Sequence, residues 1–350
     1  MKNIHGNFGL VIYFHMPNCE GSDFLPNIKD VASHAGVSVT TVSRIMNNRG
    51  YISEATRKKV YESIEILNYH PNEMAKSLYT KKSNLIGLIL PDVSMPFYAE
   101  ETKYIEESLY MNGYKLLLCN ASNNSIREKE YIAMLQRNQV DGIIIGSHTL
   151  KLEEYMKVKL PIVALDRYLG KDIPVISADH MQGGYLAANE LIRCGCKNVL
   201  QFVGNSQVKT PANERNFAFS EAMKKNNINC TNIEFPVNFF PFENYLPFIT
   251  KSLDNNPNID GIFAVDTIAL AVIKELVSRK IKIPDDVKIV GYDGIALGSI
   301  ATPTLTTIKQ PIRDIANSAV STLLYLISNH NTMIPNDIKL PLMICQGQTT

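Results

Sequence analysis

The sequence has almost no net charge, because 35 Lys and Arg residues are balanced by 34 Asp and Glu residues to give +1 at pH 7. That balance excludes a chain that binds polyanions through bulk charge. The sequence also lacks any apolar run near the ~18 residues that a membrane span needs. Residues 9–14 are too short for the hydrophobic part of a secretory signal. We therefore expect a cytoplasmic protein.

Cysteines are few and scattered, without a CxxC pair or a nearby His at the spacing of zinc ligands. Cys194 and Cys196 form the one close pair, and their spacing favours neither a metal site nor a disulfide. We expect reduced packing residues in a reducing compartment, and neither a metal nor a cofactor. The six are Cys19, Cys119, Cys194, Cys196, Cys230 and Cys345.

Motifs of common catalytic sites are missing as well. The sequence contains no GxxxxGK, GxSxG or HExxH, and Gly183 and Gly184 do not open a phosphate-binding loop after a strand. An enzyme is therefore not expected.

Residues 1–24 show neither helical nor strand periodicity. We interpret them as a disordered extension or as the result of a mis-assigned start. Leu25 precedes the letters PNIKDVA, so a start codon of the TTG or CTG kind at that position would give a chain that opens Met-Pro-Asn-Ile-Lys-Asp. A harmless disordered tail is the alternative.

The pattern of residues 25–70, called the head below, predicts three short helices. Asn27 can cap the first helix, Gly36 permits a sharp reversal, and Ser38 can cap the second. Ser53 can open the third. Two helices joined by a turn of this kind form a helix-turn-helix, although such pairs also occur in proteins that do not bind DNA.

Charge and side-chain type favour DNA as the ligand of the head. Residues 27–82 hold nine basic and five acidic residues, a balance of +4, whereas the rest of the chain holds 26 and 29, a balance of −3. In the third helix, Lys58 is placed to meet a phosphate. The second helix offers groups suited to base edges in a major groove, where Arg reads guanine and Val touches a thymine methyl. The predicted set is Val39, Thr40, Thr41, Ser43, Arg44 and Asn47.

The run NIKDVASHAGVSVTTVSRIMN, followed by YHPNEMAKSL, resembles the lactose-repressor (LacI/GalR) family of bacterial transcriptional regulators. The resemblance implies that residues 71–83 form a hinge helix and linker, in which Ala75, Lys76 and Leu78 lie on operator DNA. Leu78 and its dimer mate would wedge into the minor groove. Lys76 stands where the family more often has Arg. Because two helical turns are marginal alone in water, this helix is expected to form only on DNA or a partner.

The part of the chain from residue 84 to 350, called the body below, alternates apolar β-branched runs with helical patterns. This pattern predicts parallel sheets covered by helices in two doubly wound lobes. The resemblance implies a periplasmic-binding-protein-like effector domain behind the all-α head. It places the first lobe at 84–178 and 308–333 and the second at 179–307 and 334–350, with crossings near Ala178, Thr307 and Ile334. We also expect a strand at the letters IEFPV, residues 233–237.

Ligands of open α/β sheets collect beyond the carboxyl ends of strands, so candidate effector contacts are sought there. Aromatic rings with Asp and Arg suit a sugar. The resemblance adds an effector-binding Arg, an effector-binding carboxylate, and a Gln at the final crossing. The predicted set is Phe97, Tyr98, His148, Asp166, Arg215, Asp266, Asp293 and Gln310.

Each candidate has a structural alternative. The two aromatic residues could be packing residues, His148 a satisfied strand-end residue, and Asp166 the partner of Arg167 in an ion pair. Two residues depart from the family pattern. Ala218 replaces the usual Gly after the effector-binding Arg, and Val265 stands where Asn is common, which argues against direct contacts from the loop of Val265 and Asp266.

The resemblance is strongest to sucrose operon repressors, through NNRGYISEATRKKV, RNQVDGIIIGSH, IPVISAD and VGYDG. We predict a homodimeric repressor of a carbohydrate operon that binds near-palindromic operator DNA and responds to a sugar or sugar phosphate. One alternative is a catabolite-control regulator with a phosphoprotein co-repressor. Another is a sugar-binding transport protein, which would carry an export signal and no head.

Overall fold

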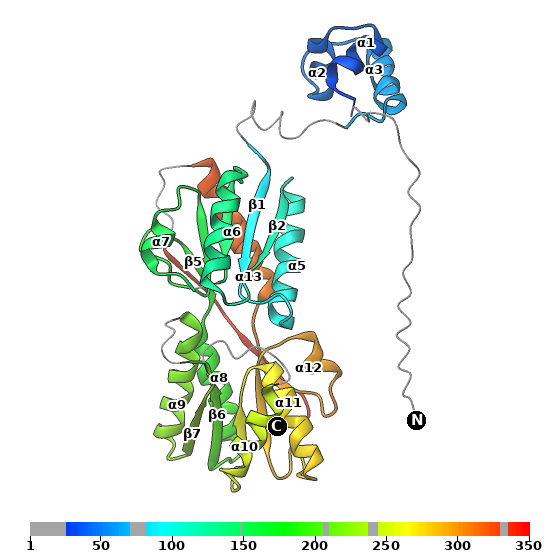
Figure 1. The fold of residues 1–350 in the computed structure, drawn as a ribbon. Helices are drawn as coiled ribbons and strands as arrows, with labels where there is room; N and C mark the ends of the chain where they lie inside the picture. Colours follow the sequence, from blue (N-terminus) through cyan, green and yellow to red (C-terminus); the bar gives the residue numbers. More distant parts are fainter. Residues whose placement is uncertain (1–25, 71–81, 148, 206–209, 237–243, 330–334) are drawn as a thin grey trace, which may run out of the picture. The chain divides into compact units, whose positions relative to one another are not determined.

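The computed structural model describes residues 26–70, 82–147, 149–205, 210–236, 244–329 and 335–350. It divides into two compact units, Met1–Lys81, which contains the head, and Lys82–Thr350, which contains the body (Figure 1). Each unit is described by itself. The predictions for residues 1–24, Ala75, Lys76, Leu78 and His148 lie outside the described residues.

The head contains the three predicted helices α1 (Ile28–Ala35), α2 (Val39–Met46) and α3 (Glu54–Ile66). Asn27 caps α1 in both directions: its side chain accepts from the Lys29 N–H at 2.8 Å, and its own N–H donates to Asp30 Oδ2 at 2.8 Å. Gly36 takes the left-handed conformation at φ 66° that the reversal requires. These local signals confirm the predicted helix-turn-helix.

A small apolar core holds the head together. Val31 of α1, Val42 and Ile45 of α2 and Val60 of α3 are all buried, and Tyr69 closes the cluster. Because α2 buries Val42 and Ile45, its opposite face is left to solvent.

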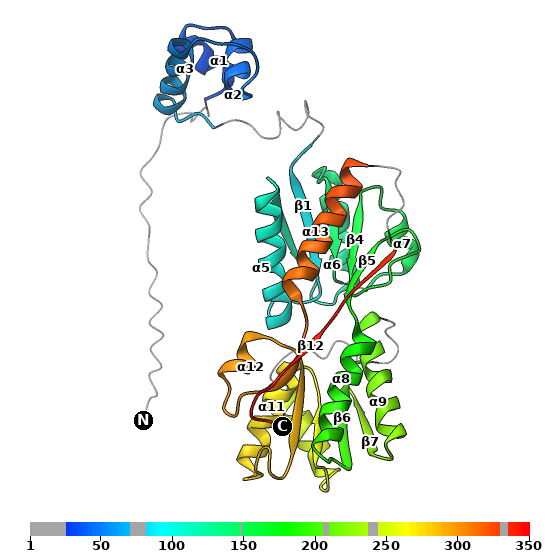
Figure 2. The same cartoon turned by 180° about the vertical axis from the view of Figure 1, so that it is seen from behind.

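The first sheet of the body contains only parallel strands, in the order β11-β5-β4-β3-β1-β2. Helices α5 and α13 cover one face, and α6 and α7 cover the other (Figures 1 and 2). The strands are β1 (Leu85–Leu90), β2 (Lys115–Asn120), β3 (Gly142–Ile145), β4 (Ile162–Leu165), β5 (Val175–Ala178) and β11 (Asp337–Leu340). The helices are α5 (Pro96–Met111), α6 (Ser125–Arg137), α7 (Leu152–Met156) and α13 (Ile312–Ser328).

The second sheet has the order β12-β10-β9-β8-β6-β7 and is parallel except for β12. Helices α8 and α9 pack on one face, and α10 and α11 on the other. The strands are β6 (Asn198–Val203), β7 (Asn229–Glu234), β8 (Gly261–Phe263), β9 (Lys288–Asp293), β10 (Thr306–Lys309) and β12 (Met343–Cys345). The helices are α8 (His180–Arg193), η1 (Pro211–Asn213), α9 (Glu214–Lys225), α10 (Tyr245–Asp254), α11 (Asp266–Ser278) and α12 (Ala296–Ile300).

The two sheets form the two predicted lobes, and α13 belongs to the first lobe as expected. Two boundaries need correction. The third crossing lies between Leu340 and Met343 rather than near Ile334, because β11 pairs with β5 in the first sheet. The strand expected at 233–237 begins at Asn229. Both β7 and β11 are edge strands with polar, half-exposed residues, so hydrophobic runs do not mark them.

In the described part of the chain, no helix is both long and apolar enough to cross a membrane.

Candidate functional site

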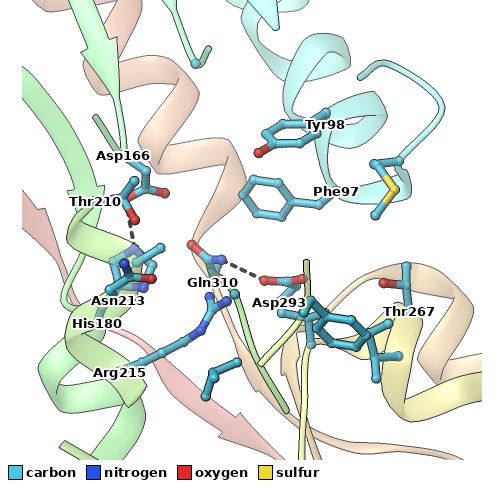
Figure 3. Close-up of a pocket in the computed structure, with 18 of the residues that line it drawn as sticks. Phe97, Tyr98, Asp166, His180, Thr210, Asn213, Arg215, Thr267, Asp293 and Gln310 are labelled. Atoms are coloured by element: carbon cyan, nitrogen blue, oxygen red, sulfur yellow. Dashed lines mark hydrogen bonds and ion pairs between the residues drawn. The ribbon is translucent and has the colours of Figure 1, made fainter. Parts of the chain in front are cut away.

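A cavity of about 280 Å³ lies where the carboxyl ends of strands from both sheets face each other (Figure 3). Its wall combines aromatic rings with acidic, basic and amide side chains. Six of the eight predicted contacts line it: Phe97, Tyr98, Asp166, Arg215, Asp293 and Gln310. Glu101, Arg167, His180 and Thr267 line it too.

The aromatic part of the wall comes from the first turn of α5. Pro96 occupies the first helical position, and the rings of Phe97 and Tyr98 lie 5.5 Å apart in an edge-to-face arrangement. Figure 3 shows both rings opposite Asp293. They therefore face the cavity, where a flat apolar surface is available to a ligand.

Asp166 ends β4 in a left-handed conformation, with φ 48°. Its Oδ1 lies 2.8 Å from Nε2 of His180, so the carboxylate is held by an imidazole. Arg167 donates to the backbone carbonyl of Asp166 at 2.6 Å and to the Tyr98 hydroxyl at 3.3 Å. The guanidinium of Arg167 thus supports the backbone and the aromatic wall, rather than forming the alternative ion pair with the Asp166 carboxylate.

Arg215 reaches the cavity from the first turn of α9. Its guanidinium carbon lies 4.4 Å from the centroid of the Tyr292 ring, so the positive charge makes a cation–π contact with that ring. Asp293 ends β9 at φ 122° and accepts a hydrogen bond from Gln310 Nε2 at 2.9 Å. Burial raises the pKa of Asp293 to about 6, and the charge of Arg215 opposes that rise.

Two cavity residues carry buried polar atoms that have no hydrogen-bond partner within the described residues: Nε of Arg167 and Oε1 of Gln310. The first needs an acceptor and the second needs a donor, and buried groups of this kind cost free energy until they are paired. Both atoms lie beneath the surface of the cavity wall, so they do not by themselves specify a ligand.

Glu101 is almost fully buried, with 2% of its surface exposed. Burial, and secondarily the charge of Asp166, raises its pKa to about 8. Its carboxyl group is therefore mainly protonated at neutral pH and can donate as well as accept.

The predicted contact from Asp266 is wrong. Its side chain is fully buried beneath the loop after β9, where Oδ1 accepts from Thr307 Oγ1 at 2.6 Å and Oδ2 accepts from the Ile295 N–H at 2.9 Å. Its neighbours Val265 and Thr267 line the cavity instead. Asp266 is thus a structural anchor of the second lobe.

Three functional candidates were missed by the sequence reasoning: Glu101, His180 and Tyr292. His180 follows a strand directly, so its strand-end position was a usable signal. Glu101 lies inside a helix and Tyr292 inside an apolar strand, so neither position in the sequence indicates a ligand site.

In the head, four of the predicted base-reading residues are exposed on α2 or at its C-terminal end, namely Val39, Thr40, Arg44 and Asn47, whereas Thr41 and Ser43 are half-buried. Thr41 and Asn47 also serve the helix itself: Thr41 Oγ1 lies 2.9 Å from the capping Ser38 hydroxyl, and Asn47 Nδ2 donates to the Ser43 carbonyl at 2.8 Å. Lys58 projects from α3 with 80% of its side chain exposed. Their contacts with DNA stay a prediction.

Comparisons with protein families divide the chain in the same way. Residues 27–72 match the bacterial regulatory proteins of the lacI family. Residues 83–347 match the periplasmic binding proteins and sugar binding domain of the LacI family.

Several curated relatives span nearly the whole chain. The sucrose operon repressor of Pediococcus pentosaceus is 38% identical over 93% of this chain and 99% of its own. The sucrose operon repressor of Streptococcus mutans is 39% identical over 92% and 98%. The ribose operon repressor of Halalkalibacterium halodurans is 39% identical over 86% and 90%.

Solved structures agree with the fold. The lac repressor dimer bound to operator and the anti-inducer ONPF has a TM-score of 0.81 at 24% identity, covering 93% of this chain and 98% of that chain. A periplasmic binding protein/LacI transcriptional regulator from Alkaliphilus metalliredigens QYMF, complexed with D-xylulofuranose, has a TM-score of 0.71 at 30% identity, covering 76% and 99%. With a helix-turn-helix head and a two-lobed body that both match, the chain belongs to the LacI family of bacterial regulatory proteins.

Proposed function

We propose that this chain represses a carbohydrate-utilisation operon, for sucrose or a related sugar, and that a sugar in the cavity controls its affinity for operator DNA. The observation that carries the proposal is the wall of the cavity, in which aromatic rings, carboxyl groups and guanidinium groups come together.

A sugar matches this wall group by group. The CH faces of a sugar ring can lie on Phe97 and Tyr98, and its hydroxyl groups can donate to carboxylate oxygens and accept from Arg215. The cavity volume of about 280 Å³ lies just below the roughly 300–1,000 Å³ typical of ligand sites. The size therefore favours a monosaccharide.

The head supplies the DNA-reading part of the proposed function. A head of this type reads one half-site, so a homodimer would read a near-palindromic operator with half-sites about one helical turn apart. Such a regulator works in the cytoplasm, where the chromosome is. The head also separates this chain from a sugar transport protein, for which the body alone would serve equally well.

Coupling between the two functions needs a change in the body that reaches the DNA-binding segment. A ligand that contacts both lobes favours one lobe arrangement over another, and such a rearrangement can alter the spacing of paired first lobes in a dimer. The operator affinity then depends on the sugar through the hinge segment.

The decisive experiment titrates the full chain, bound to its operator, with sucrose, D-fructose, D-ribose and D-xylulose, and with a phosphorylated sugar. Fluorescence anisotropy of labelled operator reports its affinity. We expect at least one neutral sugar to change operator affinity in a saturable way. Operator binding that ignores every sugar, but needs a phosphorylated partner protein, would instead support a catabolite-control regulator.

A further inference from the structure

His180 occupies an unusual place for a titratable residue. It is the first residue of α8, directly after the chain crosses from the first lobe to the second, and its surface is fully buried. Asp179 caps the helix by accepting from the Gln182 N–H at 3.0 Å, which leaves the His180 side chain free of any capping role. Some other interaction must therefore account for a buried imidazole here.

Both ring nitrogens of His180 are engaged, and with different lobes. Nε2 lies 2.8 Å from Oδ1 of Asp166, which ends β4 of the first sheet. Nδ1 lies 2.7 Å from the hydroxyl of Tyr292, which belongs to β9 of the second sheet. Figure 3 shows His180 beside Asp166 at the cavity wall. The imidazole thus connects a ligand-facing carboxylate of one lobe to a core tyrosine of the other.

The chemistry of the three groups sets the direction of the hydrogen bonds. A carboxylate only accepts, so Nε2 carries the proton that bonds to Asp166. Burial raises the pKa of Tyr292, and the charge of Arg215 only partly opposes this, so the phenol keeps its proton. In the tautomer with its proton on Nε2, the imidazole accepts from the Tyr292 hydroxyl at Nδ1.

Tyr292 extends the connection to Arg215. Its ring stacks on the His180 ring, with centroids 5.8 Å apart and planes 26° apart, and carries the Arg215 guanidinium 4.4 Å above its centroid. The Tyr292 hydroxyl lies close against Gly183 of α8: a Cβ at that glycine would be only 2.6 Å from the hydroxyl oxygen. The tyrosine therefore has little room to move on that side. His180 thus contacts Asp166 directly and is linked to Arg215 through Tyr292.

We propose that His180 is a positioning residue for the cavity ligand, because it aligns Asp166 of the first lobe with the Tyr292–Arg215 pair of the second. This inference rests on the proposed function, since it assigns how the sugar site of both lobes is held together. One oxygen of Asp166 is occupied by His180, and the other remains for a ligand hydroxyl. A ligand that binds Asp166 and Arg215 at once then depends on the His180 connection, although His180 need not touch the ligand.

The variants separate the two hydrogen bonds. His180→Leu removes both, His180→Gln keeps an amide donor that can reach Asp166, and Tyr292→Phe removes only the hydroxyl while the ring beneath Arg215 stays. Tyr155→Phe is the control, because Tyr155 is also a buried tyrosine, but its hydroxyl bonds to Glu128 away from the cavity.

Calorimetry on the full chain would measure the affinity for the neutral sugar that changes operator binding. We expect His180→Leu to bind this sugar about tenfold more weakly or worse, as for a lost charge-assisted hydrogen bond. His180→Gln should recover part of the loss, and Tyr155→Phe should bind as the wild type does. The double variant of His180→Leu and Tyr292→Phe should be no weaker than His180→Leu alone, because both act through one connection.

A second readout keeps this inference separate from the proposed function. In the full chain with ¹⁵N-labelled histidine, the His180 signal, assigned by its loss in His180→Gln, should show a proton on Nε2 only. Tyr292→Phe should move the Nδ1 resonance. If no sugar in the panel binds the wild type, the proposed function fails while this spectrum still tests the connection. Sugar affinity unchanged in a folded His180→Leu variant, or an Nδ1 resonance that Tyr292→Phe leaves unmoved, would overturn the inference.

Discussion

At the scale of single residues, three charged side chains of the cavity wall are each held by a neighbouring side chain. Asp166 is held by His180, Asp293 by Gln310, and Arg215 by the face of Tyr292. The buried Nε of Arg167 and Oε1 of Gln310 have no hydrogen-bond partner within the described residues. These observations lead to two predictions.

Arg215→Ala should leave operator binding intact and abolish the response to sugar. The variant removes the charged donor that faces the cavity, so sugar affinity should fall by about 2–3 kcal/mol. Isothermal calorimetry and operator anisotropy would measure the two effects separately. Arg313→Ala is a matched control, because Arg313 also lies over a tyrosine ring, at 4.3 Å from Tyr104, but outside the cavity. Normal induction of the Arg215 variant would place the effector site elsewhere.

Glu101 should make the body less stable as pH rises. Its folded pKa is raised from 4.5 to about 8, so the folded state binds the proton more tightly than the unfolded state. That contribution is complete below the unfolded pKa and is lost as pH rises through the folded pKa.

Urea unfolding of the body at several pH values between 4.5 and 8.5 would test this. The free energy of unfolding of the wild type should decline over this range more steeply than that of Glu101→Gln, whose amide does not titrate. Parallel pH profiles of the two proteins would contradict the assignment.

At the scale of elements, helix caps and strand ends place the functional groups. The capping serines and Asn27 orient α1, α2 and α3, so that α2 buries Val42 and Ile45 and exposes its opposite face. The carboxyl ends of β4 and β9 carry Asp166 and Asp293, and the first turns of α5 and α9 carry the aromatic pair and Arg215. These cavity residues therefore lie at the carboxyl ends of strands and in the first turns of helices.

Helices α2 and α3 should contribute to DNA binding in different ways. Arg44→Ala in α2 should cost about 1–3 kcal/mol per half-site and relax the preference at one base pair. Lys58→Ala in α3 should weaken binding to all sequences alike and reduce the salt slope by about one. Operator titrations at several salt concentrations, with base-pair variants, distinguish the two. Equal loss of discrimination in both variants would refute the assignment of α2 to base reading.

At the scale of the whole molecule, the lobes of the body are tied by more than the three crossing segments. Glu214 of the second lobe accepts from Lys339 at 2.8 Å and from the Tyr168 hydroxyl at 3.2 Å, and both partners belong to the first lobe. Such contacts can be remade when lobes rearrange, which suits a body that responds to a ligand.

Leu78→Ala should separate DNA binding from sugar binding in the direction opposite to Arg215→Ala. Loss of the predicted wedge should lower operator affinity and remove the bend in the DNA, while sugar affinity stays as in the wild type. Gel mobility of operators with the site at different positions measures the bend. An unchanged bend angle would rule out the wedge role.

The sequence by itself determined most of the elements and their order, because caps, glycine turns and apolar periodicity are local signals. Asn27, Gly36 and Ser38 predict the helix starts and the turn of the head, and the apolar runs predict the buried strands of both lobes. Strand ends also indicated Phe97, Tyr98, Asp166 and Asp293, and the family resemblance added Arg215 and Gln310; all six line the cavity.

Only the tertiary structure decided which of these side chains meet. A strand-end position tells which edge of a sheet a residue occupies, but not where its side chain points: Asp266 turns into the second lobe to bind Thr307, whereas Asp293 lines the cavity. The edge strand β11 carries polar residues, so only its pairing with β5 reveals that the chain returns to the first lobe. The contact of His180 with Asp166 and Tyr292 joins residues far apart in sequence, and no local signal specifies such a meeting.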